Sequence, residues 1–212
     1  DLKKTEVRAL AKKIGLNTAE KKDSQGLCFI GKVKLPVFLQ QQLKPKKGKV
    51  IEIDRNHETF KIHNNSYSSY ALDYSMGKIV GEHEGAHYFT IGQRKGLNIG
   101  GTPLPLFIIG TNTQDNIIYV GQGEDHPGLY RKGLTVKNDD VHWIREGLKL
   151  EIGESENYQC RIRYRQALTE AKLIQNNNEL LISFNNLQRG ITPGQFVAWY
   201  KNDELIGSGV IN

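Results

Sequence analysis

Residues 158–165 read Tyr-Gln-Cys-Arg-Ile-Arg-Tyr-Arg, an unbroken alternation of bulky and polar side chains. Successive side chains of a β-strand point to opposite faces. The stretch therefore predicts a strand that buries Tyr158, Cys160, Ile162 and Tyr164 on one face. The other face would present a row of guanidinium groups from Arg161, Arg163 and Arg165. Such a row suits contacts with phosphate groups, and cross-strand pairing with Asp or Glu is the alternative.

The sequence around this stretch has the same β character. Short apolar runs recur as far as the C-terminus, and turn residues such as Asn176-Asn177-Asn178 and Asn202-Asp203 separate them. We expect strands at 134–136, 141–144, 158–165, 171–174, 180–184, 195–200 and 206–211. Roughly eighty residues of short strands and tight turns predict a small closed barrel or a sandwich.

The first part of the chain mixes helices with strands. An apolar stripe predicts a helix capped by Thr5 and ended by Gly15, and Pro36 suits the start of a second helix at 37–43. Strands are expected at 49–54, 78–82, 106–110 and 117–121, with an elaborated loop or an extra hairpin at 55–78. The predicted fold class is mainly β with short N-terminal helices (α+β), a small central domain preceding the β-rich C-terminal one.

Length and composition exclude several classes of protein. The chain has 212 residues, of which 38% are hydrophobic and 25% charged, and this excludes disorder throughout. No run approaches the roughly 18 consecutive apolar residues of a membrane helix, and the first residues do not resemble a signal peptide. We therefore expect a soluble, cytoplasmic protein with no membrane partner. Because the chain begins with Asp rather than Met, we expect it to be part of a longer protein.

Positive charge is concentrated near the N-terminus. Residues 1–50 hold 13 Lys and Arg against 4 Asp and Glu, a net of +9, whereas the rest of the chain holds 16 against 19, a net of −3. This segregation indicates a polyanionic partner near the first fifty residues. A solvated, lysine-rich surface is the alternative.

One motif match suggests a metal site that the surrounding sequence disfavours. Residues 83–87 read His-Glu-Gly-Ala-His and fit H-E-x-x-H, which binds zinc through two histidines one helical turn apart. Gly81 and Gly85 and the strand-like residues that follow disfavour the helix that this chemistry needs. We therefore expect turn histidines and no metal.

A glycine-bounded basic segment follows that motif. Gly92-Gln93-Arg94-Lys95-Gly96 is not a nucleotide P-loop, because no Lys-Ser/Thr pair follows its second glycine. Glycines allow a phosphate to approach the backbone closely, and Arg94 and Lys95 supply charge, so an RNA or DNA backbone is one candidate ligand. A tight β-turn is the alternative.

The two cysteines have different surroundings. Cys28 and Cys160 form no Cys-x-x-Cys motif, so any cysteine chemistry rests on a single thiol. Cys28 follows a polar, Gly-containing turn amid lysines that favour its nucleophilic thiolate, although a buried apolar role is the alternative. Cys160 is predicted to be a core residue.

Five segments, taken together in their order, carry a family resemblance. They are residues 22–31 (Lys-Asp-Ser-Gln-Gly-Leu-Cys-Phe-Ile-Gly), Gly81-Glu82-His83-x-Gly85, residues 88–97 (Tyr-Phe-Thr-Ile-Gly-Gln-Arg-Lys-Gly-Leu), Arg163-Tyr164-Arg165-Gln166 and Thr192-Pro193-Gly194-Gln195. The set resembles the bacterial tRNA-specific 2-thiouridylases. This resemblance implies an ATP-pyrophosphatase domain, a small central domain and a C-terminal β-barrel similar to barrels in translation factors.

The resemblance also implies a division of the chain. Residues 1–31 would be the tail of the ATP-pyrophosphatase catalytic domain, residues 32–128 the central domain with an insertion at 55–78, and residues 129–212 the barrel. The family's Ser-Gly-Gly-x-Asp-Ser nucleotide loop has no counterpart in these residues. ATP would therefore be bound by the missing N-terminal domain, and no cofactor is expected in this chain.

The resemblance further implies the reaction and its site residues. A wobble uridine of tRNA is adenylated at carbon 2 with ATP, and a cysteine persulfide delivers sulfur to it. Cys28 matches the persulfide cysteine and could form a disulfide with a cysteine of the missing domain. A sulfur-relay protein or a cysteine desulfurase would supply the sulfur.

Residues expected to contact tRNA come from the same matches. Arg163, Tyr164 and Gln195 match family contacts, and Gln93, Arg94, Lys95 and Arg165 are further candidates. Strict alternation places Arg163 and Tyr164 on opposite faces, so a bulge or a strand end is needed there. The alternative function is a non-catalytic tRNA-binding module. A methyltransferase is disfavoured because no glycine-rich cofactor loop follows a strand.

Overall fold

The computed structural model describes residues 2–21, 43–62 and 67–212. Cys28 and the helix expected from residue 37 onward lie outside these ranges. The chain divides into two compact units, Asp1–Lys44 and Pro45–Asn212. Among the described residues, no helix is both long and apolar enough to cross a membrane.

The N-terminal unit contains helix α1 (Lys4–Lys13). The backbone N–H of Lys3 donates to Glu6 Oε2 at 2.6 Å, which gives a partner to one amide at the start of the helix. Lys3 rather than Thr5 therefore stands at the N-cap. Gly15, with φ of +75°, follows the C-terminal end as expected. The predicted apolar stripe of Val7, Leu10 and Ile14 is exposed.

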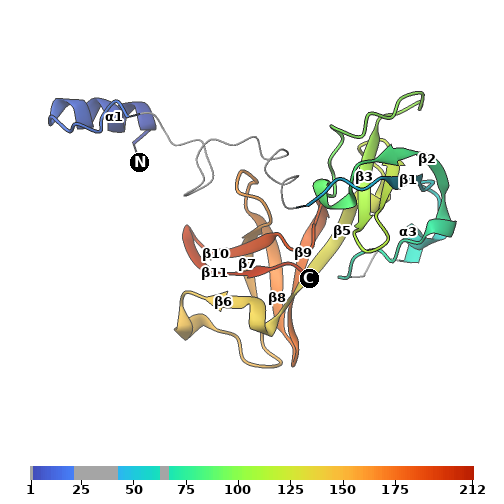
Figure 1. The fold of residues 1–212 in the computed structure, drawn as a ribbon. Coiled ribbons are helices and arrows are strands. Elements are labelled where there is room, and N and C mark those ends of the chain that lie inside the picture. Colours follow the sequence, from blue (N-terminus) through green and yellow to red (C-terminus); the bar gives the residue numbers. More distant parts are fainter. Residues whose placement is uncertain (1, 22–42, 63–66) are drawn as a thin grey trace. The chain divides into compact units, whose positions relative to one another are not determined.

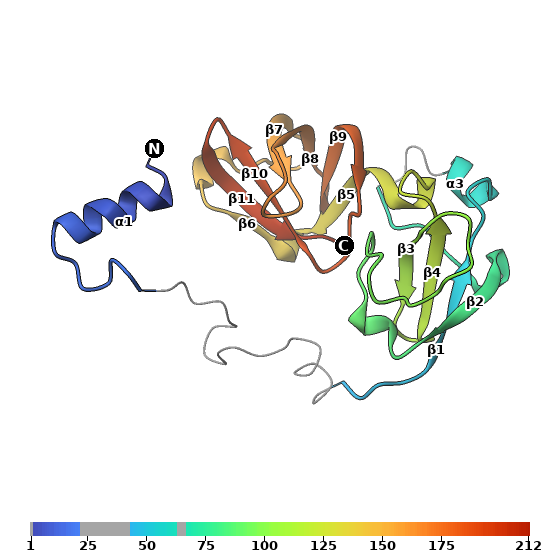
Figure 2. The same ribbon diagram turned by 90° about the horizontal axis from the view of Figure 1, so that it is seen from above.

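The second unit begins with a four-stranded central sheet in the order β2-β1-β4-β3 (Figures 1 and 2). Its strands are β1 (Gly48–Glu52), β2 (Lys78–His83), β3 (Leu106–Asn112) and β4 (Ile117–Gln122). β1 is antiparallel to β2 and parallel to β4, and β4 is antiparallel to β3. The four strands lie within three residues of their expected positions.

The central sheet buries apolar side chains on both faces. Neighbours in the sequence, such as Val50 and Ile51 or Ile108 and Ile109, belong to two separate apolar clusters because strand side chains alternate. Residues from the segment after β2, including Ala86 and Leu97, complete one cluster. Residues from the segment between β1 and β2 complete the other.

The segment 55–78 contains no strand before β2 among its described residues, so an extra hairpin is not seen there. It forms the short helix α3 (Glu58–Ile62) and a 3-10 turn at Tyr74–Met76. Phe60 is buried, and the ring of Tyr70 packs edge-on against it with centroids 5.3 Å apart. The segment is thus an elaborated loop that covers one face of the central sheet.

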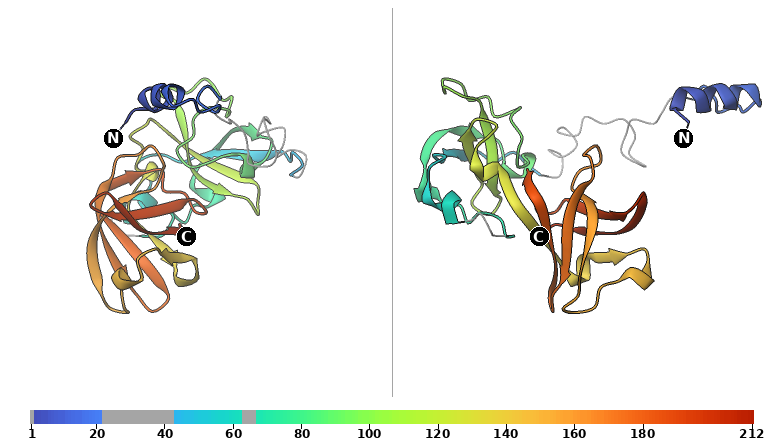
Figure 3. Two further views of the ribbon diagram at one scale, coloured as in Figure 1. Left: turned by 90° about the vertical axis from the view of Figure 1, so that its left-hand side faces the viewer. Right: turned by 180° about the vertical axis from the view of Figure 1, so that it is seen from behind.

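A seven-stranded antiparallel sheet forms the C-terminal part, in the order β5-β9-β8-β7-β10-β11-β6. Its strands are β5 (Tyr130–Lys137), β6 (Val141–Trp143), β7 (Ser155–Arg161), β8 (Thr169–Gln175), β9 (Glu179–Arg189), β10 (Phe196–Lys201) and β11 (Glu204–Val210). Figure 3, where these strands run from yellow to red, shows the sheet curling into a half-barrel. The N–H of Asn212, just after β11, donates to the carbonyl of Thr135 in β5 at 2.9 Å.

The half-barrel encloses a single apolar core. Tyr158, Cys160 and Ile162 are all buried, which confirms the alternation predicted for them. Trp199 is fully buried and packs edge-on against Trp143, with ring centroids 5.2 Å apart. The fold is mainly β with few helices, as the sequence predicts.

Candidate nucleic-acid interface

Three of the sequence segments singled out above meet where the central sheet joins the half-barrel. Arg163 lies at their centre: its Nη2 donates to the carbonyl of Gly190 at 3.1 Å and to that of Ile91 at 3.4 Å. Ile91 precedes the Gly92–Gly96 segment, and Gly190 precedes the Thr192–Gln195 segment. The structure therefore brings Arg163 together with both loops.

Gly190 is the residue that permits this approach. Its φ is +72°, and a Cβ built on it would lie 2.5 Å from Arg163 Nη2. A side chain would be strained by that backbone and would also displace the guanidinium. A glycine is thus needed for the carbonyl of residue 190 to accept from Arg163.

The predicted arginine row is wrong, because β7 ends at Arg161. Residues 162–166 form a turn that side chains hold in place. Gln166 Oε1 accepts from the N–H of Ile162 at 3.2 Å, and Arg161 Nη1 donates to the carbonyl of Tyr164 at 3.2 Å. Arg161 also lies over the ring of Tyr200, 4.7 Å from its centroid. The three arginines therefore occupy three different environments.

This strand end resolves the conflict between Arg163 and Tyr164. Beyond β7 the strict alternation no longer applies, so the two side chains need not point to opposite faces of a sheet. Tyr164, expected in the core, is 88% exposed, and Arg165 is exposed beside it. An exposed aromatic ring next to guanidinium groups can stack on a nucleic-acid base.

The Gly92–Gly96 segment is a tight turn held against β3. The N–H of Gly92 donates to the carbonyl of Ile108 at 2.7 Å, and the N–H of Ile108 donates to that of Gln93 at 3.0 Å. Gln93 also spans the turn with its side chain, since Nε2 donates to the carbonyl of Lys95 at 2.8 Å. Arg94 and Lys95 are exposed, so their charges face solvent, whereas Gln93 has an internal role.

Gln195 lies at the end of the Thr192–Gln195 turn, just before β10. Its N–H donates to the carbonyl of Thr192 at 3.2 Å, and its own carbonyl accepts from Ile211 at 2.8 Å. The residue is half-buried. These backbone bonds fix the position of Gln195 on the same turn that Arg163 contacts through Gly190.

Sequence reasoning missed a second arginine at this junction. Arg131 of β5 is only 7% exposed, and its Nη2 donates to the carbonyl of Ile191 at 3.4 Å. It lies in Tyr130-Arg131-Lys132, which precedes the strand expected at 134–136. β5 begins earlier, at Tyr130, and buries this guanidinium. Charged residues flanking an apolar run give no local signal of such burial.

The H-E-x-x-H residues do not share a helix. His83 ends β2, Gly85 has φ of +146°, and a 3-10 turn follows at Ala86–Tyr88. His83 Nδ1 accepts from the N–H of Gly85 at 2.9 Å, so the ring closes this turn. Burial lowers the pKa of His83. Within the described ranges, no group of three His, Cys, Asp or Glu side chains could hold a metal ion.

Cys160 is a free thiol inside the half-barrel core. It is fully buried, and burial raises its pKa well above the usual range. A neutral, inaccessible thiol is a poor nucleophile. Cys28, the other cysteine, lies outside the described residues.

Comparisons with known proteins cover nearly the whole chain. Residues 1–32 match the family described as tRNA methyl transferase HUP domain, residues 37–122 the tRNA methyl transferase PRC-barrel domain, and residues 131–211 the aminomethyltransferase beta-barrel domain. Over its full length the chain is 52% identical to the tRNA-specific 2-thiouridylase MnmA of Christiangramia forsetii. The chain is a homologue of the tRNA-specific 2-thiouridylases.

Further members of the family match along the full length of the chain. The enzymes of Karelsulcia muelleri and Halalkalibacterium halodurans, which carry the same name, are 48% and 40% identical. The chain covers 56% of the Christiangramia protein, 55% of the Karelsulcia protein and 50% of the Halalkalibacterium protein. It therefore spans about half the length of the curated relatives that it matches.

Proposed function

We propose that this chain is the central and C-terminal portion of a tRNA-uridine 2-sulfurtransferase that makes 2-thiouridine at the wobble position. The observation that carries the proposal is the identity of 52% to a tRNA-specific 2-thiouridylase across the full chain. The family matches at 1–32, 37–122 and 131–211 support a division into the tail of a catalytic domain, a central domain and a barrel at 1–31, 32–128 and 129–212.

In this proposal, Cys28 is the sulfur carrier. The terminal sulfur of its persulfide attacks carbon 2 of an adenylated uridine, and AMP leaves with the oxygen. The new sulfur on the uridine is then still bonded to Cys28 Sγ. A second cysteine, expected upstream, attacks Cys28 Sγ, which releases the 2-thiouridine and forms a disulfide between the two cysteines. A dithiol reductant first reduces that disulfide, and a sulfur-relay protein or a cysteine desulfurase then reloads the free Cys28 thiol with persulfide sulfur.

ATP is the co-substrate of this reaction. The described residues matched to the HUP domain form α1 and the turn after it, and they offer no glycine-rich phosphate loop. We therefore assign no residue of this chain to ATP. The 212-residue chain alone should not thiolate tRNA.

The junction between the central sheet and the half-barrel is the proposed tRNA-binding surface. Arg163 and Tyr164 would contact the tRNA directly, with Gln195 beside them and Arg94, Lys95 and Arg165 supplying nearby charge. Gln93 would act by shaping its turn, since its side-chain amide is already used there. Arg163 has two backbone partners at the junction, so its loss would affect structure as well as binding.

Tyr164 separates these two effects. We expect Tyr164→Ala to weaken tRNA binding by the 212-residue chain while its melting temperature stays unchanged, because the ring is 88% exposed. Tyr74→Ala, at a 47% exposed tyrosine of the central domain, is the matched control and should bind tRNA normally. Arg163→Ala should also reduce the salt dependence of binding by roughly one phosphate contact. Unchanged tRNA affinity in both junction variants would reject this surface.

Substitutions of the two cysteines distinguish an enzyme from a non-catalytic binding module. In the complete enzyme, Cys28→Ser should abolish 2-thiouridine formation and leave tRNA binding intact. Cys160→Ser is the control and should retain the chemistry, because that thiol is buried away from solvent. The measurement is the 2-thiouridine content of tRNA. Normal thiolation by Cys28→Ser would remove Cys28 from the mechanism and favour the binding module.

A further inference from the structure

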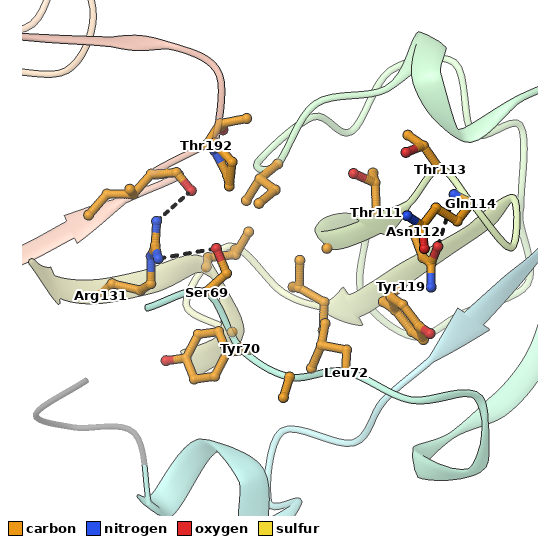
Figure 4. A pocket seen from close by; sticks show the side chains of 18 residues that line it. Ser69, Tyr70, Leu72, Thr111, Asn112, Thr113, Gln114, Tyr119, Arg131 and Thr192 are labelled. Carbon is orange, nitrogen blue, oxygen red and sulfur yellow. Dashed lines mark hydrogen bonds between the residues drawn. The ribbon is translucent and has the colours of Figure 1, made fainter. Parts of the chain in front are cut away.

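A cleft of about 620 Å³ opens beside the junction (Figure 4). Its walls come from residues 69–72, the β3–β4 hairpin, the start of β5 and the turn after Gly190. The volume lies within the range of roughly 300–1,000 Å³ that is typical of small-molecule sites. None of the residues assigned to tRNA contact above lines it.

Arg131 is the one charged residue among the described residues that line the cleft. It is 7% exposed, and its hydrogen-bond partners in the described part of the chain are neutral: Ser69 Oγ at 3.3 Å, the carbonyl of Ile191 at 3.4 Å and the carbonyl of Tyr67 at 3.5 Å. Within the described part of the chain, it forms no ion pair with a carboxylate. Burial lowers the pKa of this guanidinium to about 10.

A buried cation without a counter-charge is unfavourable, and an anion in the cleft would remove that cost. The three hydrogen bonds of Arg131 are long for N–H···O contacts, which usually span about 2.7–3.2 Å. A guanidinium has five N–H donors, so donors remain for a ligand. Because none of the described residues that line the cleft is acidic, its electrostatics favour a negatively charged group.

The rest of the cleft suits a larger ligand than an inorganic anion. Apolar residues such as Leu72, Ile109 and Ile191 line it, and Tyr119 adds an aromatic ring. Thr111, Thr113 and Gln114 lie at the end away from Arg131 (Figure 4). The cleft thus offers a cation at one end, an apolar wall and polar groups at the other end.

We propose that this cleft binds a phosphate-bearing ligand of mononucleotide size, with the phosphate on Arg131 and the base toward Thr111 and Gln114. The nucleotide could be free or part of an RNA strand, since both present the same chemistry. The site does not depend on Cys28 or on the proposed tRNA surface around Tyr164. Evidence against one of these two proposals would therefore not contradict the other.

The test measures binding of UMP, uridine and inorganic phosphate to the 212-residue chain by calorimetry. UMP should bind saturably, phosphate more weakly, and uridine least. Arg131→Met, which retains the length and apolar stem of the side chain, should weaken UMP binding by roughly tenfold or more, because it removes a charge-assisted contact. Arg145→Met is the matched control at an exposed arginine outside the cleft and should bind UMP as the wild type does.

A second variant covers the case in which Arg131→Met fails to fold. Thr111 is exposed at the rim, so Thr111→Trp should obstruct the cleft without touching Arg131 and should also abolish UMP binding. Absence of UMP binding by the wild type would overturn the proposal. Equal UMP affinity in the wild type and Thr111→Trp would overturn it as well.

Competition identifies the source of the nucleotide. If saturating tRNA displaces UMP from the wild type but not from the Tyr164→Ala variant, the cleft takes a nucleotide of the bound RNA strand. If UMP and tRNA bind at the same time, the cleft takes a free nucleotide. Both results support the site, and the UMP measurements alone decide whether it exists.

Discussion

The central sheet and the half-barrel bury their apolar side chains in different ways. The seven strands β5–β11 curl around one core, which includes Trp199, Phe184 and Leu173. The four strands β1–β4 carry two clusters, one on each face, and each cluster is completed by residues outside the sheet. A four-stranded sheet with an apolar cluster on each face needs cover from residues outside the sheet, so the irregular segments around it are part of its structure.

Because the central sheet needs cover from outside, the segment at 55–78 has a structural role. Phe60, Tyr70 and Leu72 cover one face of the central sheet, and Tyr70 also reaches the start of β5, where its hydroxyl donates to the carbonyl of Tyr130 at 2.8 Å. Tyr67 contacts Ser183 of β9 at 3.4 Å. The segment therefore covers the sheet and contacts the half-barrel.

The largest effect is expected in the half-barrel core. Trp199→Ala should lower the free energy of unfolding by roughly 3–5 kcal/mol, because it leaves a cavity beside Trp143. Urea denaturation of the 212-residue chain measures the change. Tyr164→Ala, at an exposed position, should stay within about 0.5 kcal/mol of the wild type. Similar losses in both variants would contradict a self-enclosed core.

Removing the cover of the central sheet should have a more local effect. Phe60→Ala should cost about 3 kcal/mol, since the ring packs against Tyr70 and His126. Hydrogen exchange should show faster exchange in β1 and β4, while β8 and β9 keep their protection. Lys61→Ala, beside it on α3, is the control. Equal loss of protection in both sheets would mean that they unfold as one unit.

A smaller cost is expected at the buried cysteine. Cys160→Ser should lower the stability of the half-barrel by about 1–3 kcal/mol, because it places a hydroxyl in an apolar core. Gln159→Ala, on the opposite face of β7, should cost less. Thermal unfolding of both variants provides the comparison, and a Gln159→Ala loss larger than that of Cys160→Ser would contradict the assigned faces.

The smallest expected difference between the two sheets is in how their stability depends on pH. His83 at the end of β2 and His126 after β4 are both buried, and burial lowers the pKa of each below its usual 6.5. A histidine with a lowered folded pKa stabilises the fold above its unfolded pKa, and that stability is lost as the pH falls through about 6.5 toward the folded value. The central sheet should therefore lose hydrogen-exchange protection first as the pH decreases from 7 to 5.

A pair of variants checks this assignment. His126→Gln should make the stability of the central sheet less dependent on pH in that window. His142→Gln, at an exposed histidine of β6, should leave the dependence unchanged. A pH profile that His142→Gln alters more than His126→Gln would rule out the buried histidine as its source.

The sequence by itself determined where along the chain the strands lie and which face of the strand around Cys160 is buried. Alternation in residues 158–165 predicted that Cys160 is buried, and the apolar runs located the eleven strands of the described residues closely enough to identify a mainly β chain. These features are local, because the two faces of a strand follow from backbone geometry and from the adjacent side chains alone. The order of five short motifs was also sufficient to identify the family.

Only the tertiary structure decided where the strands end and which distant groups meet. β7 stops at Arg161, so Arg163 turns toward the carbonyls of Ile91 and Gly190, which lie 72 and 27 residues away in the sequence. Arg131 is buried because β5 begins before the predicted strand and packs beside the segment at 67–72. Such contacts depend on register and on loop positions set by other strands, and no local pattern of residues encodes them.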